Sequence, residues 1–107
     1  MLIVTTDNIP GKKIVKVLGC VADSTVRSKH LGKDICSVFK SLAGGELKEM
    51  TDMQNESRQI AIERIIAKAE ELGANAIVGL RLTSSSIMSG ASEMVAYGTA
   101  VYIEDVE

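Results

Sequence analysis

The stretch over residues 69–80 constrains the fold most, because a helical pattern stops there at one glycine and a strand pattern begins at once. Gly73 suits the left-handed backbone position just past a helix end, where a side chain would cost energy. After it, apolar residues alternate at strand spacing: Ala76, Val78, Leu80 and Leu82. The junction predicts a long helix that leads directly into a β-strand.

The chain has the size of one domain. It contains 107 residues, and no internal repeat, linker or low-complexity tract divides residues 1–107. No apolar run approaches the ~20 residues of a membrane span, and residues 2–4 are too few for a signal-peptide core. We therefore expect a cytoplasmic protein whose two cysteines stay reduced.

The charge balance gives no broad positive field that would attract nucleic acid, because 14 acidic and 12 basic residues leave a net charge of −2. A local basic cluster lacks the interleaved aromatic residues that stack on bases, so a solvated loop is the favoured interpretation. The residues of this cluster are Arg27, Lys29, His30 and Lys33. Neither nucleic acid nor a membrane is an expected partner.

Strand patterns lie at both ends of the chain. Residues 2–6 form a short β-prone segment that ends in turn formers, and a second strand follows it. The last strand, over residues 93–103, carries small residues on one face, which would let a helix approach closely. In the second strand, one face would hold Ile14, Leu18, Cys20 and Ala22, and the other Val15, Val17 and Val21.

Two helices are predicted between these strands. Residues 30–43 have the apolar spacing of a helix, which Gly44-Gly45 would end. Thr51 and Gln54 have the spacing of a capping box, so a second helix should begin near Thr51 and run to Leu72. Its buried stripe would be Ile62, Ile65, Ile66, Ala69 and Leu72.

This order of elements predicts an α+β, two-layer β-α-β-β subunit. A right-handed crossover makes the strands that flank the helices parallel, so the last strand fits between them. The antiparallel sheet would have the order 1-3-2, with the helices on one face. A monomer would leave an apolar patch of the other face in water, which predicts a homo-oligomer with closed rotational symmetry. That patch comprises Val15, Val17, Val95, Val101 and Ile103.

Soft-metal binding is the sharpest chemical hypothesis. Cys20, His30 and Cys36 offer thiolate and imidazole ligands, and Met88 and Met94 could add thioethers. The spacing argues against a dedicated site, because such sites set two ligands a few residues apart on one loop. The favoured interpretation is a small buried hydrophobe for Cys20 and a surface or helix-start residue for His30. The metal ligands therefore stay unknown.

Signatures of catalysis and of nucleotide binding are weaker. Cys36 and His30 lie six residues apart, so they would not face each other on a helix, and no third residue orients the imidazole. The glycines form no phosphate-binding loop. We therefore expect no enzyme and assign no catalytic or cofactor-binding residue. A group of acidic residues suits the positive end of the second helix better than a hard cation: Glu46, Glu49, Asp52 and Glu56.

Five segments occur in order along the chain: Gly44-Gly45-Glu46, Glu56-Ser57-Arg58, Ala61-Ile62-Glu63-Arg64, Leu72-Gly73-Ala74-Asn75-Ala76-Ile77-Val78-Gly79 and Ala96-Tyr97-Gly98-Thr99-Ala100-Val101. Together they resemble the YbjQ-like family, an uncharacterised family labelled "putative heavy-metal-binding domain". The resemblance implies a subunit similar to those of dodecins, assembled as a ring of five, in which short strands such as residues 2–6 help subunits join. It supplies no metal motif for Cys20, His30 or Cys36.

Together these observations predict a cytoplasmic homo-oligomer that binds a metal ion or small ligand at subunit junctions or in the central channel of a ring. One alternative is a structural or regulatory assembly module with a protein partner. A second alternative is an enzyme with a site composed between subunits, for which Glu46, Asp34 and Arg58 would be the residues to mutate.

Overall fold

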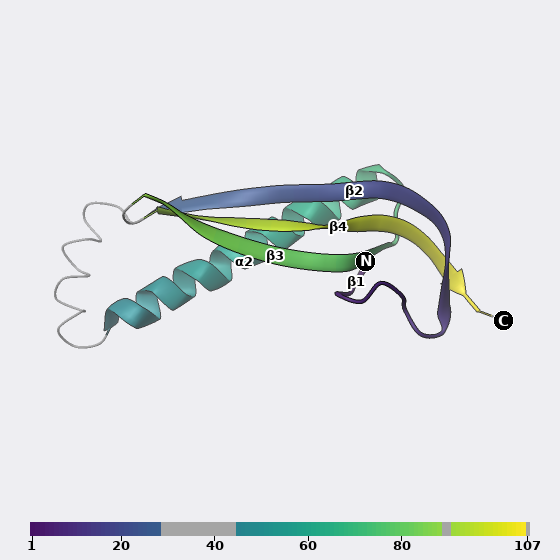
Figure 1. Cartoon of the computed structure of the whole chain (residues 1–107), viewed down its shortest axis with the longest axis horizontal. Helices are drawn as coiled ribbons and strands as arrows, with labels where there is room; N and C mark the ends of the chain where they lie inside the picture. The colour runs from purple at the N-terminus through teal and green to yellow at the C-terminus, as the bar shows by residue number, and fades with distance from the viewer. Residues whose placement is uncertain (29–44, 89–90, 107) are drawn as a thin grey trace.

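A computed structural model describes residues 1–28, 45–88 and 91–106 of the chain. Figure 1 shows one long helix that lies along one face of a narrow, twisted sheet. The helix predicted over residues 30–43 lies outside the described residues. The elements are β1 (Leu2–Ile3), β2 (Lys12–Ser28), α2 (Gly45–Glu71), β3 (Ala76–Met88) and β4 (Ala91–Asp105).

The described sheet has four strands in the order β1-β3-β4-β2, so the predicted antiparallel order 1-3-2 is wrong. β4 does lie between β2 and β3 and runs antiparallel to both. The difference comes from β1, which pairs in parallel with β3 through Leu2 with Ala76 and Ile3 with Ile77. This segment, to which the resemblance gave a role in joining subunits, therefore extends the sheet of its own chain.

α2 begins at Gly45, well before the start predicted at Thr51. The capping box is wrong, because Thr51 and Gln54 both lie inside the helix. The predicted end is confirmed: Gly73 has a φ of 86°, and its N–H donates to the carbonyl oxygen of Glu70 at 3.0 Å. The Ala74 N–H donates to the Ala69 carbonyl oxygen at 3.0 Å, which completes a Schellman motif.

The main core lies between α2 and the sheet. Ala61 and Ile65 of α2 are fully buried against Ala96 and Ala100 of β4. The small-residue face predicted for the last strand is therefore confirmed, and it lets the helix approach the central strand. Leu72, which was predicted to complete the helix stripe, is 48% exposed because the helix ends before it.

The alternation predicted for the second strand fails at a β-bulge. The register of β2 against β4 shifts between Val17 and Gly19, and Gly19 has a φ of 127°, which favours glycine. An extra residue moves every later side chain to the other face of the sheet. Leu18 and Val21 consequently pack in the same helix-facing core, although a strict period of two had placed them on opposite faces.

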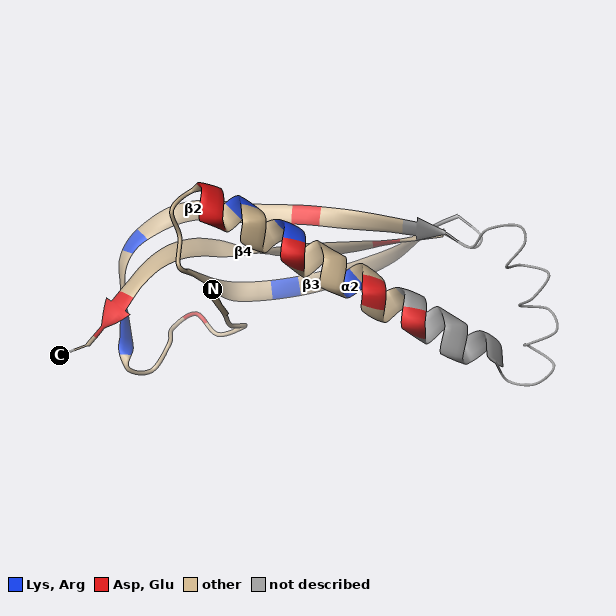
Figure 2. Ribbon diagram, turned by 180° about the vertical axis from the view of Figure 1, so that it is seen from behind, with Lys and Arg blue, Asp and Glu red and all other residues tan. Residues whose placement is uncertain are grey.

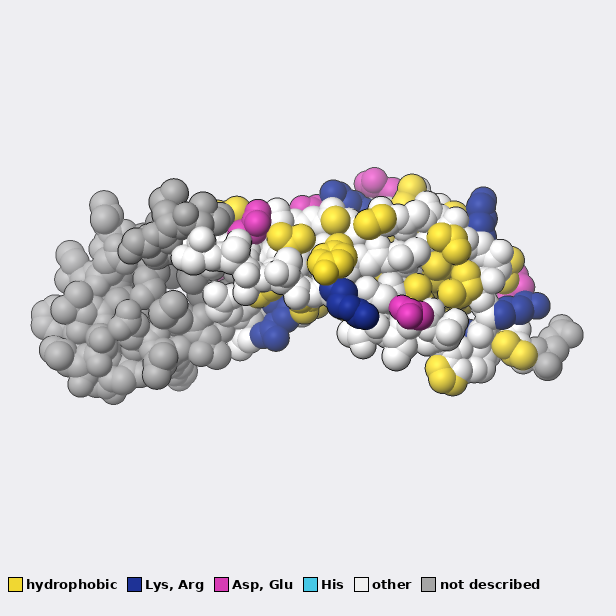
Figure 3. Space-filling model, viewed as in Figure 1, with side chains coloured by type: hydrophobic (Ala, Val, Ile, Leu, Met, Phe, Trp, Pro, Cys, Tyr) yellow, Lys and Arg dark blue, Asp and Glu magenta, His cyan; other side chains and the backbone are white. Residues whose placement is uncertain are grey.

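The sheet face opposite α2, called the outer face below, carries a second cluster that the chain covers itself. Val4 and Ile9, from the segment between β1 and β2, pack against it. They leave Val101 of the predicted patch only 1% exposed, whereas Val17 is 65% exposed. Figure 3 views this face and shows apolar side chains gathered toward the end of the sheet that bears the termini. The cluster comprises Ala76, Val78, Val101 and Ile103.

The fold is long and thin. Its Cα radius of gyration is 17.7 Å and its principal extents are 59 × 22 × 17 Å, whereas a compact domain of this length has a radius of gyration of about 13 Å. The 17 residues of β2 alone correspond to roughly 55 Å of extended strand. Among the described residues, α2 covers one face of the sheet, and Val15 and Val17 of β2 stay exposed. Among the described residues, no helix is long and apolar enough to span a membrane.

Candidate functional site

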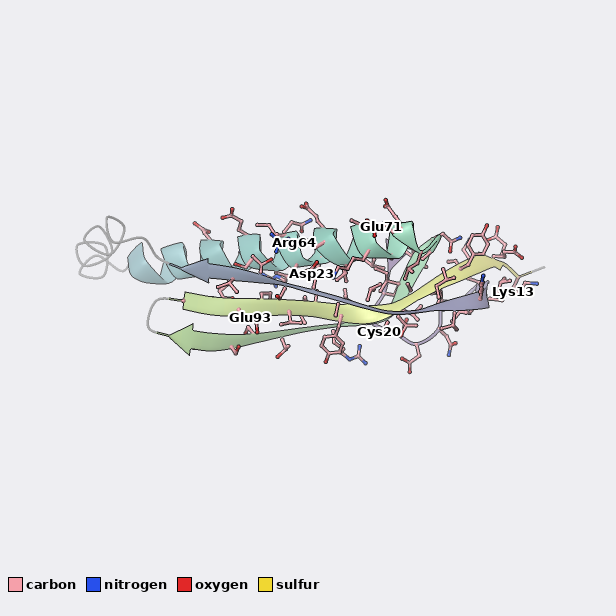
Figure 4. The ribbon with its side chains drawn as sticks, turned by 90° about the horizontal axis from the view of Figure 1, so that it is seen from above. Lys13, Cys20, Asp23, Arg64, Glu71 and Glu93 are labelled. Carbon is pink, nitrogen blue, oxygen red and sulfur yellow. The ribbon has the colours of Figure 1, made fainter. Side chains whose placement is uncertain are left out.

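Basic side chains of α2 reach the free edge of β2. Lys68 Nζ donates to the carbonyl oxygen of Ala22 at 2.9 Å and lies 3.3 Å from Oδ2 of Asp23. Arg64 Nη1 donates to the carbonyl oxygen of Ser24 at 2.6 Å. Figure 2 shows basic and acidic positions along α2, whose C-terminal end lies near β2, and Figure 4 shows Asp23 and Arg64 on the side of the sheet that faces α2. We call Asp23, Arg64 and Lys68 the β2 clamp.

The electrostatics of the β2 clamp favour an ionised Asp23. Its Oδ1 accepts the Ser24 N–H at 2.7 Å, and this bond is the main cause that lowers the pKa of Asp23 below its ordinary value of 3.8. Partial burial acts in the opposite direction, and the charges of Lys68 and Arg64 add to the lowering. The carboxylate therefore stays charged at neutral pH, and its bonds are made within the cluster. That arrangement is typical of a structural contact.

The outer face offers the exposed side chains from which a binding surface can be built. Residues that pair directly across strands share one face, so Cys20 lies beside Thr99, and Tyr97 lies beside Arg81. Cys20 is exposed and Tyr97 is 40% exposed. We call these four residues the outer-face site. They combine a thiol, a phenol, a hydroxyl and a guanidinium on a surface that α2 does not cover.

Arg81 is held in place by backbone carbonyls. Its Nη1 donates to the oxygen of Thr5 at 2.8 Å and to the oxygen of Leu80 at 2.9 Å. The segment that follows β1 therefore fixes the guanidinium next to Tyr97. Sequence reasoning missed Arg81, because an isolated arginine within a strand pattern carries no signal of its own; only the pairing of β3 with β4 reveals its neighbour.

The structure separates two of the predicted soft-metal ligands. Cys20 is exposed on the outer face, so its interpretation as a small buried hydrophobe is wrong. Met94 packs against the helix-facing core instead and pairs with Thr25, whereas Cys20 pairs with Thr99. His30, Cys36 and the side chain of Met88 lie outside the described residues. Within the described part of the chain, no three His, Cys, Asp or Glu residues form a group that could hold a metal ion.

Of the other residues weighed in the sequence, the structure describes the side chains of Asp52, Glu56 and Arg58. Arg58 is exposed and donates to Oδ1 of Asn55 one turn earlier on α2, and Asp52 is exposed on the same helix. Glu56 also takes part in an interaction. The remaining candidate side chains lie outside the described residues: Arg27, Lys29, Lys33, Asp34, Glu46 and Glu49.

Comparison with known proteins identifies the family. A family model, YbjQ, with the description "Putative heavy-metal-binding", matches residues 1–104. The chain belongs to the YbjQ family. A UPF0145 protein from Clostridium perfringens is 61% identical to this chain over 105 residues. The alignment covers 98% of this chain and 99% of that protein. A UPF0145 protein from Thermotoga maritima is 53% identical over 106 residues, with coverage of 99% and 100%. These names give no activity, and the function of the family is unknown.

A solved structure shares the fold of this YbjQ-family chain. It is a crystal structure of a protein of unknown function from Pediococcus pentosaceus, described as a member of the DUF74 family. The TM-score is 0.69 at 19% sequence identity, and the match covers 97% of this chain and 98% of that one. At this identity the match supports the small α+β fold alone.

Proposed function

We propose that this YbjQ-family chain is the subunit of a cytoplasmic homo-oligomer that binds a metal ion or small ligand at the junctions between subunits and does not catalyse a reaction. The observation that carries the proposal is the elongated subunit with an incompletely covered outer face. Val15 and Val17 are 53% and 65% exposed on β2. Burying apolar surface gains about 25 cal/mol per Å², so a second copy that covers these valines stabilises the assembly.

The placement of Cys20 supports a site at a junction. Its thiol is exposed on the outer face, and a thiolate is a preferred ligand of soft metal ions. A single thiolate makes a weak site, but rotational symmetry can bring equivalent residues of several copies toward one axis. The family description points to the same class of ligand.

The oligomer is tested by sedimentation velocity at micromolar concentration. We expect the wild-type protein to sediment as an assembly and Val17→Lys to shift it toward the lone subunit. Val106→Lys is the matched control, because Val106 is 57% exposed but lies beyond the end of β4. A wild-type chain that stays a well-folded lone subunit would contradict the proposal.

The ligand is tested separately on reduced protein. Native mass spectrometry of protein purified from cells should show a retained extra mass on the assembly. A titration with Cd²⁺ should show tighter binding by the wild-type protein than by Cys20→Ser, with Cys36→Ser as the comparison thiol variant. Equal, weak Cd²⁺ binding by all three proteins contradicts the metal ligand, and a retained organic mass would then favour the small molecule.

A further inference from the structure

Two opposite charges lie close together on the outer face without forming an ion pair. Arg81 of β3 is held by the carbonyl oxygens of Thr5 and Leu80. Asp7 follows Thr5 by two residues and is exposed. Within the described part of the chain, neither Asp7 nor Arg81 has a charged partner. Figure 3 shows one basic and one acidic group side by side near the middle of this face.

The backbone around Asp7 is anchored to β3 and to itself. The Gly79 N–H donates to the Thr6 carbonyl oxygen at 2.9 Å, and Thr6 Oγ1 donates to the Asn8 carbonyl oxygen at 2.7 Å. The Asp7 carboxylate lies over Gly79, because a Cβ at Gly79 would be 3.7 Å from Asp7 Oδ1 and would meet nothing else within 4 Å. This places the carboxylate next to the β3 backbone, two residues before Arg81.

The guanidinium of Arg81 keeps the donors that suit a carboxylate. Both of its carbonyl bonds use Nη1, so Nε–H and the Nη2 hydrogens have no partner in the described part of the chain. Nε–H and one Nη2–H point the same way along one edge of the planar group, which matches the two oxygens of a carboxylate. Because Nη1 is already held, a ligand immobilises less side-chain freedom here than on a mobile surface arginine.

The path of the chain limits how far apart the two charges lie. Extended backbone spans at most roughly 3.6 Å per residue, so Asp7 lies within about 7 Å of Thr5, the residue that anchors Arg81. A ligand that pairs with both side chains must therefore carry an anionic and a cationic group close together. A free α-amino acid meets this condition, because its carboxylate and ammonium groups are attached to the same carbon. Phosphate and other simple anions lack the cation, and the Asp7 carboxylate would repel them.

An aromatic side chain borders the two charges. Tyr97 pairs with Arg81 across the strands and is 40% exposed. Its ring offers apolar surface to the carbon atoms of a ligand and a negative face to an ammonium group. We propose that Asp7, Arg81 and Tyr97 form a site for a free α-amino acid, in which Arg81 binds the carboxylate and Asp7 binds the ammonium group. All three side chains belong to one chain, so binding needs no second copy and does not rest on the proposed assembly.

An NMR titration of the wild-type protein with each common L-amino acid tests the site. We expect at least one of them to bind and to shift the signals of the Arg81 Nε–H and the Gly79 amide. Acetate, methylammonium and inorganic phosphate carry one kind of charge, and 4-aminobutyrate carries both charges farther apart. Each of these probes should bind at least tenfold more weakly. No binding by any amino acid, or equal binding by any of these probes, overturns the proposal.

Two variants test the separate roles of the charges. Asp7→Asn should keep the fold, because the Asp7 side chain makes no bond in the described part of the chain. It should weaken amino-acid binding at least tenfold without weakening acetate binding. Arg81→Lys should weaken the binding of both, since an ammonium group cannot bind two carboxylate oxygens side by side. Glu104→Gln removes an exposed carboxylate near the end of β4 and serves as the matched control.

The outcomes separate this site from the proposed oligomer. Amino-acid binding that survives Asp7→Asn, or that falls equally in Glu104→Gln, overturns the amino-acid site. Amino-acid binding by a wild-type chain that stays a lone subunit supports the site and contradicts only the oligomer.

Discussion

The side-chain amide of Asn75 pairs with both backbone groups of Ile103. Asn75 Nδ2 donates to the Ile103 carbonyl oxygen at 2.9 Å, and the Ile103 N–H donates to Asn75 Oδ1 at 2.8 Å. The Asn75 N–H also donates to the Val101 carbonyl oxygen at 3.1 Å. One side chain thereby extends the ladder between β3 and β4 beyond the start of β3, and it ties the turn after α2 to the central strand.

Replacing Asn75 should destabilise the fold. Asn75→Ala leaves the part-buried Ile103 N–H and carbonyl without partners, and an unsatisfied buried group costs about 1–3 kcal/mol. We expect urea denaturation to show a free energy of unfolding lower by about 2 kcal/mol. Asn55→Ala, which removes an exposed amide of α2, should change it by less than about 0.5 kcal/mol. Equal values for the two variants would show that the Asn75 pairing contributes nothing.

The lowered pKa of Asp23 predicts a pH dependence of stability. A carboxyl group with a lower pKa in the folded than in the unfolded state stabilises fully above its ordinary value, here 3.8, and this contribution is lost as the pH falls through the folded value. Asp23→Asn should therefore be less stable than wild type at neutral pH, and the difference should shrink below about pH 4. Thermal midpoints measured from pH 7 to pH 2 check this. A difference that does not vary with pH would contradict the assignment.

Gly98 should not tolerate a side chain. A Cβ at this position would lie 2.7 Å from Ile77 Cγ2 and 3.2 Å from the Val78 carbonyl oxygen. Overpacking of this kind costs about 1–3 kcal/mol, so Gly98→Ala should lower the free energy of unfolding by that amount. Ile77→Leu removes the branch at Cβ, and the double variant should recover part of the loss. Chemical denaturation of the two single variants and of the double variant gives the coupling free energy between the two positions. Strictly additive changes in the free energy of unfolding would exclude the contact with Ile77 as the cause.

Ile9 belongs to the segment that packs over the outer face, so its side chain should contribute to the stability of the fold. Ile9 is half-buried against the cluster that contains Val101 and Ile103, and removing buried methyl groups destabilises by the lost burial and by the cavity left. Because Ile9 is only half-buried, we expect Ile9→Ala to cost about 1 kcal/mol and to increase the binding of a dye that reports exposed apolar surface. Val15→Ala, at an exposed position, should cost little in the lone subunit. Similar losses for both would argue against the cover.

Local patterns predicted the elements best where a few neighbouring residues decide the outcome. The helix end at Gly73 and the small face of β4 at Ala96 and Ala100 are confirmed. The start of α2 was missed, because Thr51 and Gln54 match a capping box that the longer helix does not use. The face of Leu18 was missed because the bulge before Gly19 shifts the alternation by one residue.

The sequence predicted less of the candidate site than of the fold. Cys20 was singled out for its chemistry but placed in a buried position, and the structure exposes it. Arg81 carried no signal, because its place beside Tyr97 depends on how β3 pairs with β4. Arg64 and Lys68 carried no signal of their targets in the sequence, because the carbonyl oxygens on β2 that they bind depend on which edge of the sheet the helix lies against.

The amino-acid sequence by itself determined the α+β order of elements, the end of the long helix and the small face that receives it. These features depend on backbone sterics and on side-chain size within short stretches of chain. The tertiary structure alone decided which edge of the sheet the helix binds, which face is covered and where Cys20 lies. The contact of Lys68 with Ala22 joins residues 46 positions apart, and that of Arg64 with Ser24 spans 40; no periodic pattern encodes such a pairing, because it arises only when the whole chain packs.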